Sequence, residues 1–429
     1  MMTLTAMQKY KTYKWSGNPF FGDIPSCWDI YPLFKIAKIK SIINKQDEEL
    51  LSVYLDRGVI KFSDVDEKRT NVTSLDLSKY QFVEKGDFVL NNQQAWRGSV
   101  GVSNHIGIVS PAYLVLSLSK EINPKYANYL FRDGSMVSQY LICSKGVGTI
   151  QRNLYWPHLR RTIVALPSYI EQTAIANFLD TKTNQIDEAI AIKEQQIALL
   201  NERKQILIQQ AVTQGLDPTV PMKDSGVEWI GKIPEHWIVK RAKYLFNEID
   251  ERSVNGDEEL LSVSHITGVT PRSEKNVNMF MAEDYSGSKT CEKNDLVFNI
   301  MWAWMGALGV SDRRGIVSPS YGVFRAKAES TFNPIFLEYL LKSTNYIEHY
   351  NKVSTGLHSS RLRFYGHMFF DMEMGFPSFE EQNYIIEHVQ KESDVIDKAL
   401  SLQEQQIEAL KEYKTTLINS AVTGKIKVV

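Results

Sequence analysis

Two aligned segments carry the residue types that proteins use against nucleic acids. GVGTIQRNLYW, residues 146–156, aligns with GLHSSRLRFYG, residues 356–366, and both combine an opening glycine with hydroxyl, amide or guanidinium groups. Arginine can bond guanine bidentately, Gln or Asn can bond adenine in the same way, and small hydroxyls suit phosphate oxygens. The residue types therefore favour contact with nucleic acid, although drift on a surface loop would also produce two differing copies.

A second pair of segments keeps a frame while its polar residues change. Residues 91–97 read NNQQAWR and stand opposite residues 299–305, NIMWAWM, so that Ala-Trp is retained and the flanking residues differ. A constant loop frame with variable flanking residues is what two domains that recognise different base sequences require. Trp96 and Trp304 themselves are more often core residues than stacking platforms.

The candidate DNA-contacting residues are the polar and cationic groups of these segments and of one further Arg pair. They are Asn92, Gln93, Gln94, Arg97, Lys145, Thr149, Gln151, Arg152, Asn153, Arg313, Arg314, His358, Ser359, Ser360, Arg361 and Arg363.

Residue patterns typical of catalysis are missing from the sequence. It holds no phosphate-binding loop, no glycine-rich dinucleotide fingerprint and no Asn-Pro-Pro-Tyr/Phe motif, which Asn18-Pro19-Phe20 approaches most closely. The eight histidines show no metal-ligand spacing. We therefore expect no catalytic residue, no metal and no cofactor in this chain.

The positions of these segments follow from an internal duplication. Residues 84–111 reappear at 292–319, a shift of 208, and Gly22-Asp23-Ile24-Pro25 with Trp28 reappears 209 residues later. ELLSV and EQQI each recur after 210 residues. The chain is therefore two copies of a unit of about 210 residues, too long for a solenoid repeat and large enough to form a domain.

Each copy begins with a mixed region and ends with a helical one. Short apolar runs such as DFVLN predict strands, and the segments NPKYANYLFR and NPIFLEYLLKS predict short helices after an Asn-Pro start. We predict an α+β fold. Its parts are an N-terminal tail (1–21), a first domain (22–166), a central helix with linker (167–221), a second domain (222–376) and a C-terminal helix (377–429).

Heptads predict that the two long helices pair. Apolar or tolerated positions recur at alternating steps of four and three residues, and a helix of ~30 residues, about 45 Å long, must bury such a stripe. We expect an antiparallel coiled coil with pseudo-twofold symmetry; alternatively, each helix packs on its own domain. The expected pairing residues are Ile186, Ile190, Ile197, Leu200, Leu207, Ile396, Leu400, Ile407, Leu410 and Leu417.

Polar residues interrupt both stripes. These are Lys193 and Lys204 in the first, and Gln403 and Lys414 in the second. They fix the register of pairing, or else the lysines extend their charged ends into solvent without a specific role.

Composition sets broader limits. The chain has 429 residues, 43% of them hydrophobic, and a formal charge of -1. By our count the tail carries +3, residues 22–161 carry +4 and each helical segment carries -3, so nucleic acid is not expected along the helices. Three cysteines are too few for a disulfide framework, and buried reduced thiols in a cytoplasmic protein are expected. Neither a signal peptide nor a membrane span is predicted, because the most apolar run, 296–310, is too short.

The chain resembles the specificity subunits of type I restriction–modification enzymes. The resemblance covers nearly all of it and rests on four paired features: the Gly-x-Ile-Pro-x-x-Trp starts, Pro167 and Pro377 each followed by Glu-Gln, the Glu-Gln-Gln-Ile heptads and the Ala-Val-Thr helix ends. It implies two target-recognition domains, each reading one half of a bipartite DNA site, and paired helices that act as spacer and docking surface for two methyltransferase subunits.

The resemblance also implies where the chemistry lies. Those methyltransferase subunits would hold S-adenosylmethionine, and up to two restriction subunits using ATP and Mg could join, while the specificity subunit itself is non-catalytic. Because recognition residues in this family vary with the target, the base contacts named above remain inferences from the loops. Two other hypotheses remain: a coiled-coil scaffold or adaptor without a DNA-reading role, and an enzyme with an unrecognised site.

Overall fold

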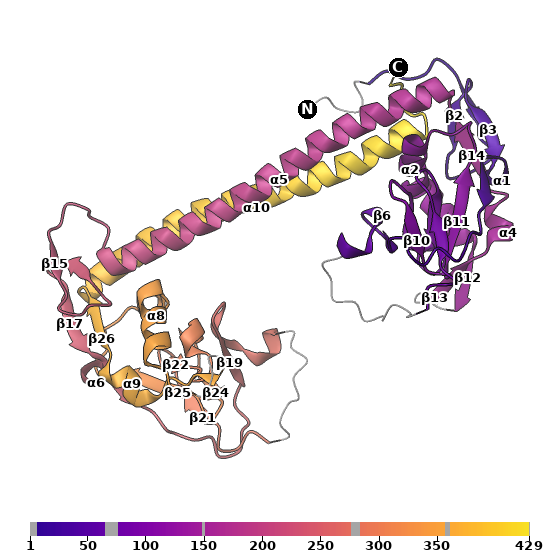
Figure 1. The fold of residues 1–429 in the computed structure, drawn as a ribbon. Coiled ribbons are helices and arrows are strands. Elements are labelled where there is room, and N and C mark those ends of the chain that lie inside the picture. The colour runs from indigo at the N-terminus through magenta and orange to yellow at the C-terminus, as the bar shows by residue number, and fades with distance from the viewer. Residues whose placement is uncertain (1–6, 65–75, 148–150, 276–283, 357–360, 429) are drawn as a thin grey trace. The chain divides into compact units, whose positions relative to one another are not determined.

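The computed structural model describes residues 7–64, 76–147, 151–275, 284–356 and 361–428. It forms two compact units, Met1–Lys193 with Glu404–Val429, and Glu194–Gln403. Each unit therefore combines one mixed α/β domain with half of each long helix, whereas the sequence assigned each helix to a segment of its own (Figure 1). The domain boundaries inferred from the sequence stay predictions.

The first unit is built around a four-stranded antiparallel sheet with the order β4-β11-β8-β9. These strands span Ala37–Ile39, Tyr113–Leu118, Phe88–Asn91 and Val100–Val102. Smaller two-stranded pairs surround the sheet: β1 (Tyr13–Trp15) with β2 (Asp23–Pro25), β3 (Asp29–Pro32) with β14 (Ile163–Leu166), β5 (Leu51–Tyr54) with β6 (Gly58–Lys61), β7 (Gln81–Val83) with β10 (Gly107–Val109), and β12 (Ser144–Val147) with β13 (Gln151–Leu154).

The second unit repeats this sheet as β18-β25-β22-β23, at Phe246–Glu248, Gly322–Ala326, Leu296–Phe298 and Leu308–Val310. Its pairs are β15 (Met222–Asp224) with β16 (Lys232–Pro234), β17 (Ile238–Arg241) with β26 (Glu373–Phe376), β19 (Leu261–Ser264) with β20 (Gly268–Pro271), and β21 (Lys289–Cys291) with β24 (Gly315–Val317). An isolated bridge between Thr355 and Arg363 stands where the first unit has β12–β13.

Short helices complete both domains and begin as the sequence predicted. Asn123 caps α2 (Pro124–Arg132) by accepting from the amides of Lys125 and Tyr126, and Asn333 does the same for α7 (Pro334–Leu341). The other short helices are α1 (Leu33–Ile36), α3 (Gly134–Ile142), α4 (Trp156–Leu159), α6 (Ala242–Leu245), α8 (Thr344–Val353) and α9 (Gly366–Asp371), with 3-10 turns η2 (Phe62–Asp64), η3 (Ala95–Arg97), η4 (Arg272–Glu274) and η5 (Ala303–Met305).

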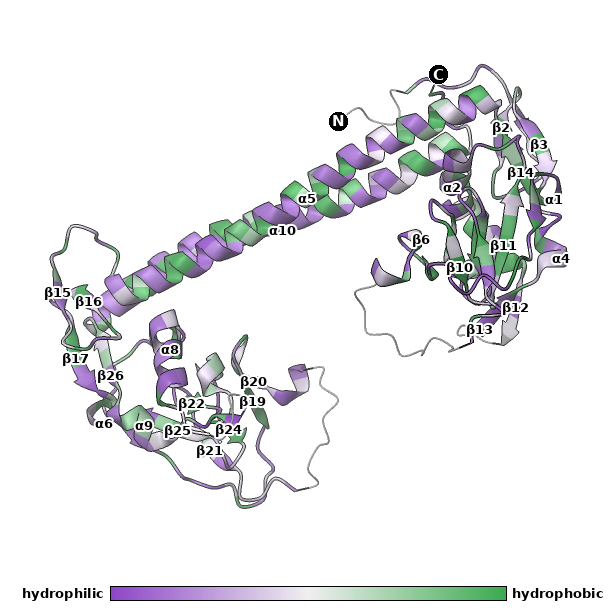
Figure 2. Cartoon of the chain, in the orientation of Figure 1, coloured by the Kyte–Doolittle hydropathy of each residue, from purple (hydrophilic) through white to green (hydrophobic). Residues whose placement is uncertain are grey.

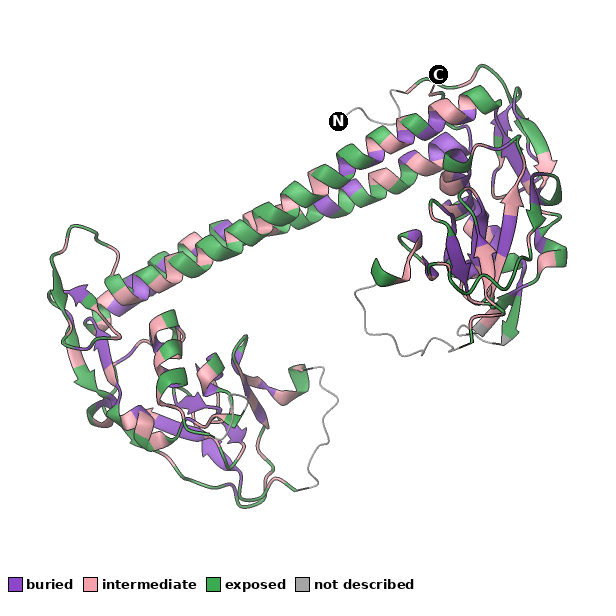
Figure 3. Cartoon of the chain, viewed as in Figure 1, coloured by how far each residue is buried: buried purple, intermediate pink, exposed green. Residues whose placement is uncertain are grey.

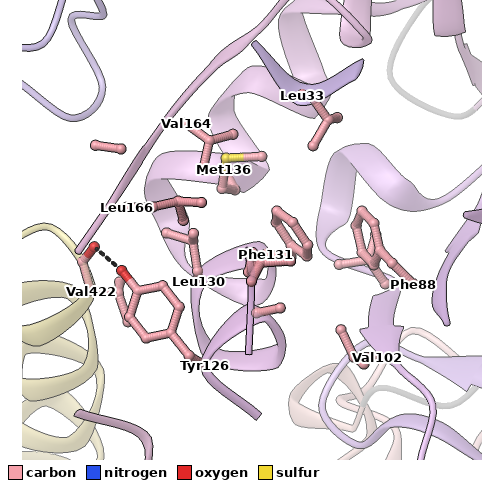
Figure 4. Packing of buried hydrophobic residues seen from close by; sticks show 14 of the residues in the cluster. Leu33, Phe88, Val102, Tyr126, Leu130, Phe131, Met136, Val164, Leu166 and Val422 are labelled. Atoms are coloured by element: carbon pink, nitrogen blue, oxygen red, sulfur yellow. Dashed lines mark hydrogen bonds between the residues drawn. The ribbon is translucent and has the colours of Figure 1, made fainter. Parts of the chain in front are cut away.

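The core of the first unit joins its domain to the end of the last helix. Phe88 of the sheet stacks on Phe131 of α2 with ring centroids 4.3 Å apart. The buried Tyr126 hydroxyl donates to the carbonyl of Val422, at 3.3 Å (Figure 4). The last turn of the C-terminal helix is therefore part of this domain's core.

The long helices α5 (Tyr169–Gln214) and α10 (Phe379–Val422) contain 46 and 44 residues. The expected length of ~30 residues was wrong, because the heptad pattern starts only at Ile186. The earlier turns pack on the helix's own domain, where Ile175 and Leu179 are fully buried, as are Ile385 and Val389 in the second unit. Each long helix therefore packs first on its own domain and then against the other long helix, so that both of the expected arrangements occur.

The Glu-Gln pair at the start of each helix fixes it to its domain. Glu171 accepts from the indole of Trp28 at 3.3 Å, and Glu381 from that of Trp237 at 3.1 Å. The buried side-chain amide of Gln172 accepts from the backbone N–H of Asn123 and donates to the backbone carbonyls of Glu121 and Pro167. Gln382 makes the corresponding three bonds. The repeated sequence motif is therefore a docking device for the helix.

The two long helices pack together within each unit, as predicted for an antiparallel coiled coil. Hydrophobic residues recur along both helices, and in the middle of each the predicted stripe is less exposed than the residues between (Figures 2 and 3). Ile186, Leu410 and Leu417 belong to the core of the first unit, and Leu207 packs against that of the second. Both helices are followed by a left-handed glycine, Gly215 and Gly424.

Two further expectations have clear outcomes. Cys143 and Cys291 are buried, but the expectation of a buried Cys27 was wrong, because the neighbouring Trp28 fills the core and leaves Cys27 exposed.

The apolar run 296–310 forms β22, η5 and β23 rather than one helix. Among the described helices none is long and apolar enough to cross a membrane.

Candidate nucleic-acid interface

The loop after β8 has a rigid frame that both domains share. Asn91 accepts from the amide of Gln93 at 3.1 Å, and the Trp96 indole donates to the Gln93 carbonyl at 3.0 Å. Gly98, with φ of 102°, turns the chain into β9.

The corresponding loop of the second domain is built in the same way. Asn299 accepts from Met301, the Trp304 indole donates to the Met301 carbonyl, and Gly306 has φ of 82°. The residues common to both copies, Asn, Ala, Trp and Gly, therefore hold the loop, which leaves the other positions free to differ.

A backbone contact joins this loop to the other predicted segment. The amide of Leu154, at the end of β13, donates to the carbonyl of Asn92 at 3.0 Å. In the second domain the amide of Phe364 donates to the carbonyl of Ile300, also at 3.0 Å. The described parts of the two segments singled out from the sequence are thus in contact within each domain.

Two arginines lie over the ring of Trp96 at this surface. The guanidinium carbons of Arg97 and Arg152 lie 4.6 and 5.8 Å from the centroid of its ring. Stacking on an indole holds a guanidinium in place while leaving its N–H groups available. Among the residues that the structure describes, neither arginine has a salt bridge to a carboxylate. Lys145 lies 4.4 Å over the ring of Tyr155 on the same hairpin.

The remaining predicted residues differ in accessibility. Gln93, Arg97, Lys145, Asn153 and Arg361 are exposed, and Asn92, Gln94, Arg152 and Arg363 are partly exposed. Gln151 is described only as a backbone partner in β13. Thr149, His358, Ser359 and Ser360 lie outside the described residues. Trp96 and Trp304, expected in the core, are only partly buried, and Ala95 and Ala303 fill the core instead.

Arg313 and Arg314 are less suited to phosphate contact than the sequence suggested. Both precede β24 and pair with carboxylates: Arg313 with Asp312 at 2.8 Å and Glu259 at 3.6 Å, Arg314 with Glu292 at 3.3 Å. The hydrogen bond to Asp312 raises the pKa of Arg313 above its usual value. Their charge is therefore largely compensated within the domain.

Sequence reasoning missed the turn between β5 and β6. Ser99 donates to the carbonyl of Val53 at 2.8 Å, and a Cβ at Gly98 would lie 3.5 Å from the exposed Leu55 side chain. In this turn, which borders the same surface, the guanidinium carbon of Arg57 lies 5.0 Å from the centroid of the Tyr54 ring. The repeated ELLSV marks the strand, but nothing in the sequence links its turn to a loop more than 40 residues later.

Sites for metals are not evident in the described part of the chain, where no group of three or more His, Cys, Asp or Glu residues could hold an ion.

Comparison with known proteins gives a consistent result. No protein-family model matches the chain. The type I restriction enzyme MjaVIII specificity subunit of Methanocaldococcus jannaschii is 24% identical over 439 aligned positions, covering 94% of each chain. The putative MjaX specificity subunit of the same organism is 22% identical over 56% of each chain.

Solved structures share the fold at low identity. A chain from a structure concerned with complex assembly and conformational transition of the type I R-M system has a TM-score of 0.64 at 13% identity, covering 93% of this chain and 98% of that one. The HsdS subunit from Thermoanaerobacter tengcongensis has a TM-score of 0.55 at 14% identity, covering 94% and 98%. The resemblance indicated by the sequence is thereby confirmed: over nearly its whole length, the chain is similar to the specificity subunits of type I restriction enzymes and has their fold.

Proposed function

We propose that the chain is the sequence-specific DNA-binding subunit of a type I restriction–modification complex. Each domain reads one half of a bipartite target, and the paired helices set the spacing and dock two methyltransferase subunits. The subunit itself is non-catalytic, and the S-adenosylmethionine, ATP and Mg that the reactions need are held by its partners. It acts in the cytoplasm, where it meets double-stranded DNA and, in the complete complex, up to two restriction subunits.

The observation that carries this proposal is the pair of arginines on Trp96. Two cations that share one aromatic ring and lack a carboxylate partner among the described residues repel each other, so the arrangement favours an acceptor-rich ligand. Their N–H groups match both the guanine edge and phosphate oxygens. DNA supplies both kinds of acceptor.

The packing of the helices supports the spacing role. Lys204 of α5 donates to both carboxylate oxygens of Asp397 of α10, at 2.7 and 2.8 Å, and Lys414 of α10 pairs with Asp187 of α5 in the same way. Lys193 also bonds Gln406. Polar partners across a coiled coil fix its register, and a fixed register is what a spacer between two readers requires.

Methylation-sensitive sequencing of DNA from cells that carry the chain with its methyltransferase tests the proposal. We expect one methylated motif made of two specific half-sites with an unspecified gap of constant length. An uninterrupted motif, or none, would contradict the proposal. The alternative of a scaffold or adaptor predicts that the methyltransferase complex shifts DNA equally well with and without this chain.

A further inference from the structure

The second domain presents an apolar surface where the first presents cations. Arg97 and Arg152, the two residues over Trp96, align with Met305 and Leu362. Beside Trp304 lies a second indole instead, Trp302, with ring centroids 5.9 Å apart. Trp302 is 46% exposed and Met305 40% exposed.

This exposure does not come from a differently built loop. The loop hydrogen bonds of Asn299, Trp304 and Ile300 match those of the first domain, so Trp302 takes the place of Gln94 on an unchanged frame. Large exposed aromatic side chains side by side are uncommon on a protein surface and mark contact sites.

The neighbouring residues indicate what covers the surface. Through its bond with Phe364, the loop adjoins the segment that carries Arg361 and Arg363, of which Arg361 is exposed. The apolar patch thus adjoins a segment that carries positive charge, and among the described residues no cation is found over the ring of Trp302 or Trp304. A ligand with an apolar group among phosphates fits this arrangement.

We propose that Trp302 and Met305 read the second half-site through the 5-methyl group of thymine, the apolar group on the major-groove edges of base pairs. The inference rests on the proposed function. It assigns different chemistry to the two half-sites, with guanidinium groups acting in the first and apolar contact in the second.

Replacing thymine by uracil removes that methyl group and nothing else. We would measure binding of the complete complex with its methyltransferase to a target duplex, with each thymine of each half-site replaced in turn. One uracil in the second half-site should weaken binding about fourfold, the value of one buried methyl group. Uracil at any thymine of the first half-site should have no effect, because the guanidinium contacts of Arg97 and Arg152 do not use a methyl group.

The variant Trp302→Ala should abolish this uracil effect, because the contact it reports is gone. Tyr244→Ala is the matched control, since Tyr244 is an aromatic residue of the same domain, 65% exposed, on α6. It should retain the fourfold discrimination.

The outcomes separate this inference from the proposed function. If the complex binds no specific duplex, the proposed function fails. If it binds specifically but the second half-site has no thymine, or tolerates uracil throughout, the inference is overturned and the proposed function stands. If Trp302→Ala prevents assembly with the methyltransferase, or leaves the uracil effect unchanged in the assembled complex, the surface is not a thymine contact and the inference is again overturned.

Discussion

Lys414 of α10 donates to both carboxylate oxygens of Asp187 of α5, each at 2.7 Å. The same bond recurs with the helices exchanged, because Asp397 and Lys204 lie 210 residues from Asp187 and Lys414. Two ion pairs related in this way define one antiparallel register in both units, and the duplication of the sequence thereby becomes pseudo-twofold pairing of the helices.

Reversal of one ion pair tests this register. Lys414→Glu places two carboxylates together and should lower the free energy of unfolding by up to about 1 kcal/mol, since both side chains are partly exposed. Asp187→Lys combined with Lys414→Glu should restore most of the lost free energy of unfolding. Denaturant unfolding measures this free energy for the single and the double variant. Lys411→Glu, beside Glu408 within α10, is the control, and the Asp187 change should not rescue it. Rescue of that control would contradict the register.

Lengthening both helices tests the spacing role. Four residues inserted after Leu200 and four after Leu400 keep both ion pairs in register and add about 6 Å of helix. We expect the gap between half-sites to grow by about two base pairs, at 3.4 Å each. Sequencing of methylated sites gives the gap directly. An insertion after Leu200 alone disrupts the register and should reduce methylation. An unchanged gap in the double insertion would contradict a spacer.

Removal of an arginine from Trp96 tests the first reader. Arg152→Ala should cost about 1–3 kcal/mol of DNA binding and relax specificity at one position if it contacts a guanine. Arg314→Ala is the control, because Glu292 already compensates that charge, and its effect should be small. Titrations at several salt concentrations separate base from phosphate contacts, since each lost phosphate contact reduces the slope by about 0.9. Equal losses of DNA binding in the two variants would contradict the assignment of Arg152, rather than Arg314, to the DNA interface.

The buried glutamines at the helix starts should matter for stability. Gln172→Ala leaves three backbone groups without their partner and should cost about 2 kcal/mol. Gln382→Ala should cost a similar amount, because its three bonds are equivalent. Gln205→Ala, at an exposed position of α5, should change stability by less than about 0.5 kcal/mol. Urea unfolding compares the three; a Gln172 effect as small as that of Gln205 would refute the docking role.

Acid should weaken the second domain through His349. This ring stacks on Trp229 at 4.2 Å, and burial, with a smaller contribution from Lys352, lowers its pKa. Since the folded pKa lies below the unfolded one, its contribution is intact above about pH 6.5 and is lost as the pH falls. Melting curves at pH 7.5 and pH 5.5 should show a smaller loss for His349→Gln, the residue type of Gln139 in the first domain. An equal loss would exclude His349 as the cause.

The fold could be predicted where a pattern repeats locally. The short apolar run at Phe88–Asn91, the Asn caps of α2 and α7 and the heptads of both long helices all depend on neighbouring residues, and each is found as predicted. The length of α5 was underestimated because its first turns are buried by the domain, which hides them from a heptad search.

The candidate site could be predicted only in part. Its two segments carry recognisable polar residues. Their contact depends on a backbone hydrogen bond between Leu154 and Asn92, which no sequence pattern predicts. The stacking of Arg152 on Trp96 follows from that bond and joins residues 56 positions apart. Conversely, the charge of Arg313 was visible in the sequence, whereas its compensation by Glu259 was not.

Exchange of residues 22–166 for the first domain of another specificity subunit tests the central claim most directly. Methylation-sensitive sequencing of the chimera with its methyltransferase should reveal a target in which one half-site has changed, while the other half-site and the gap are retained. A change in both half-sites, or in neither, would contradict two independent readers joined by a fixed spacer.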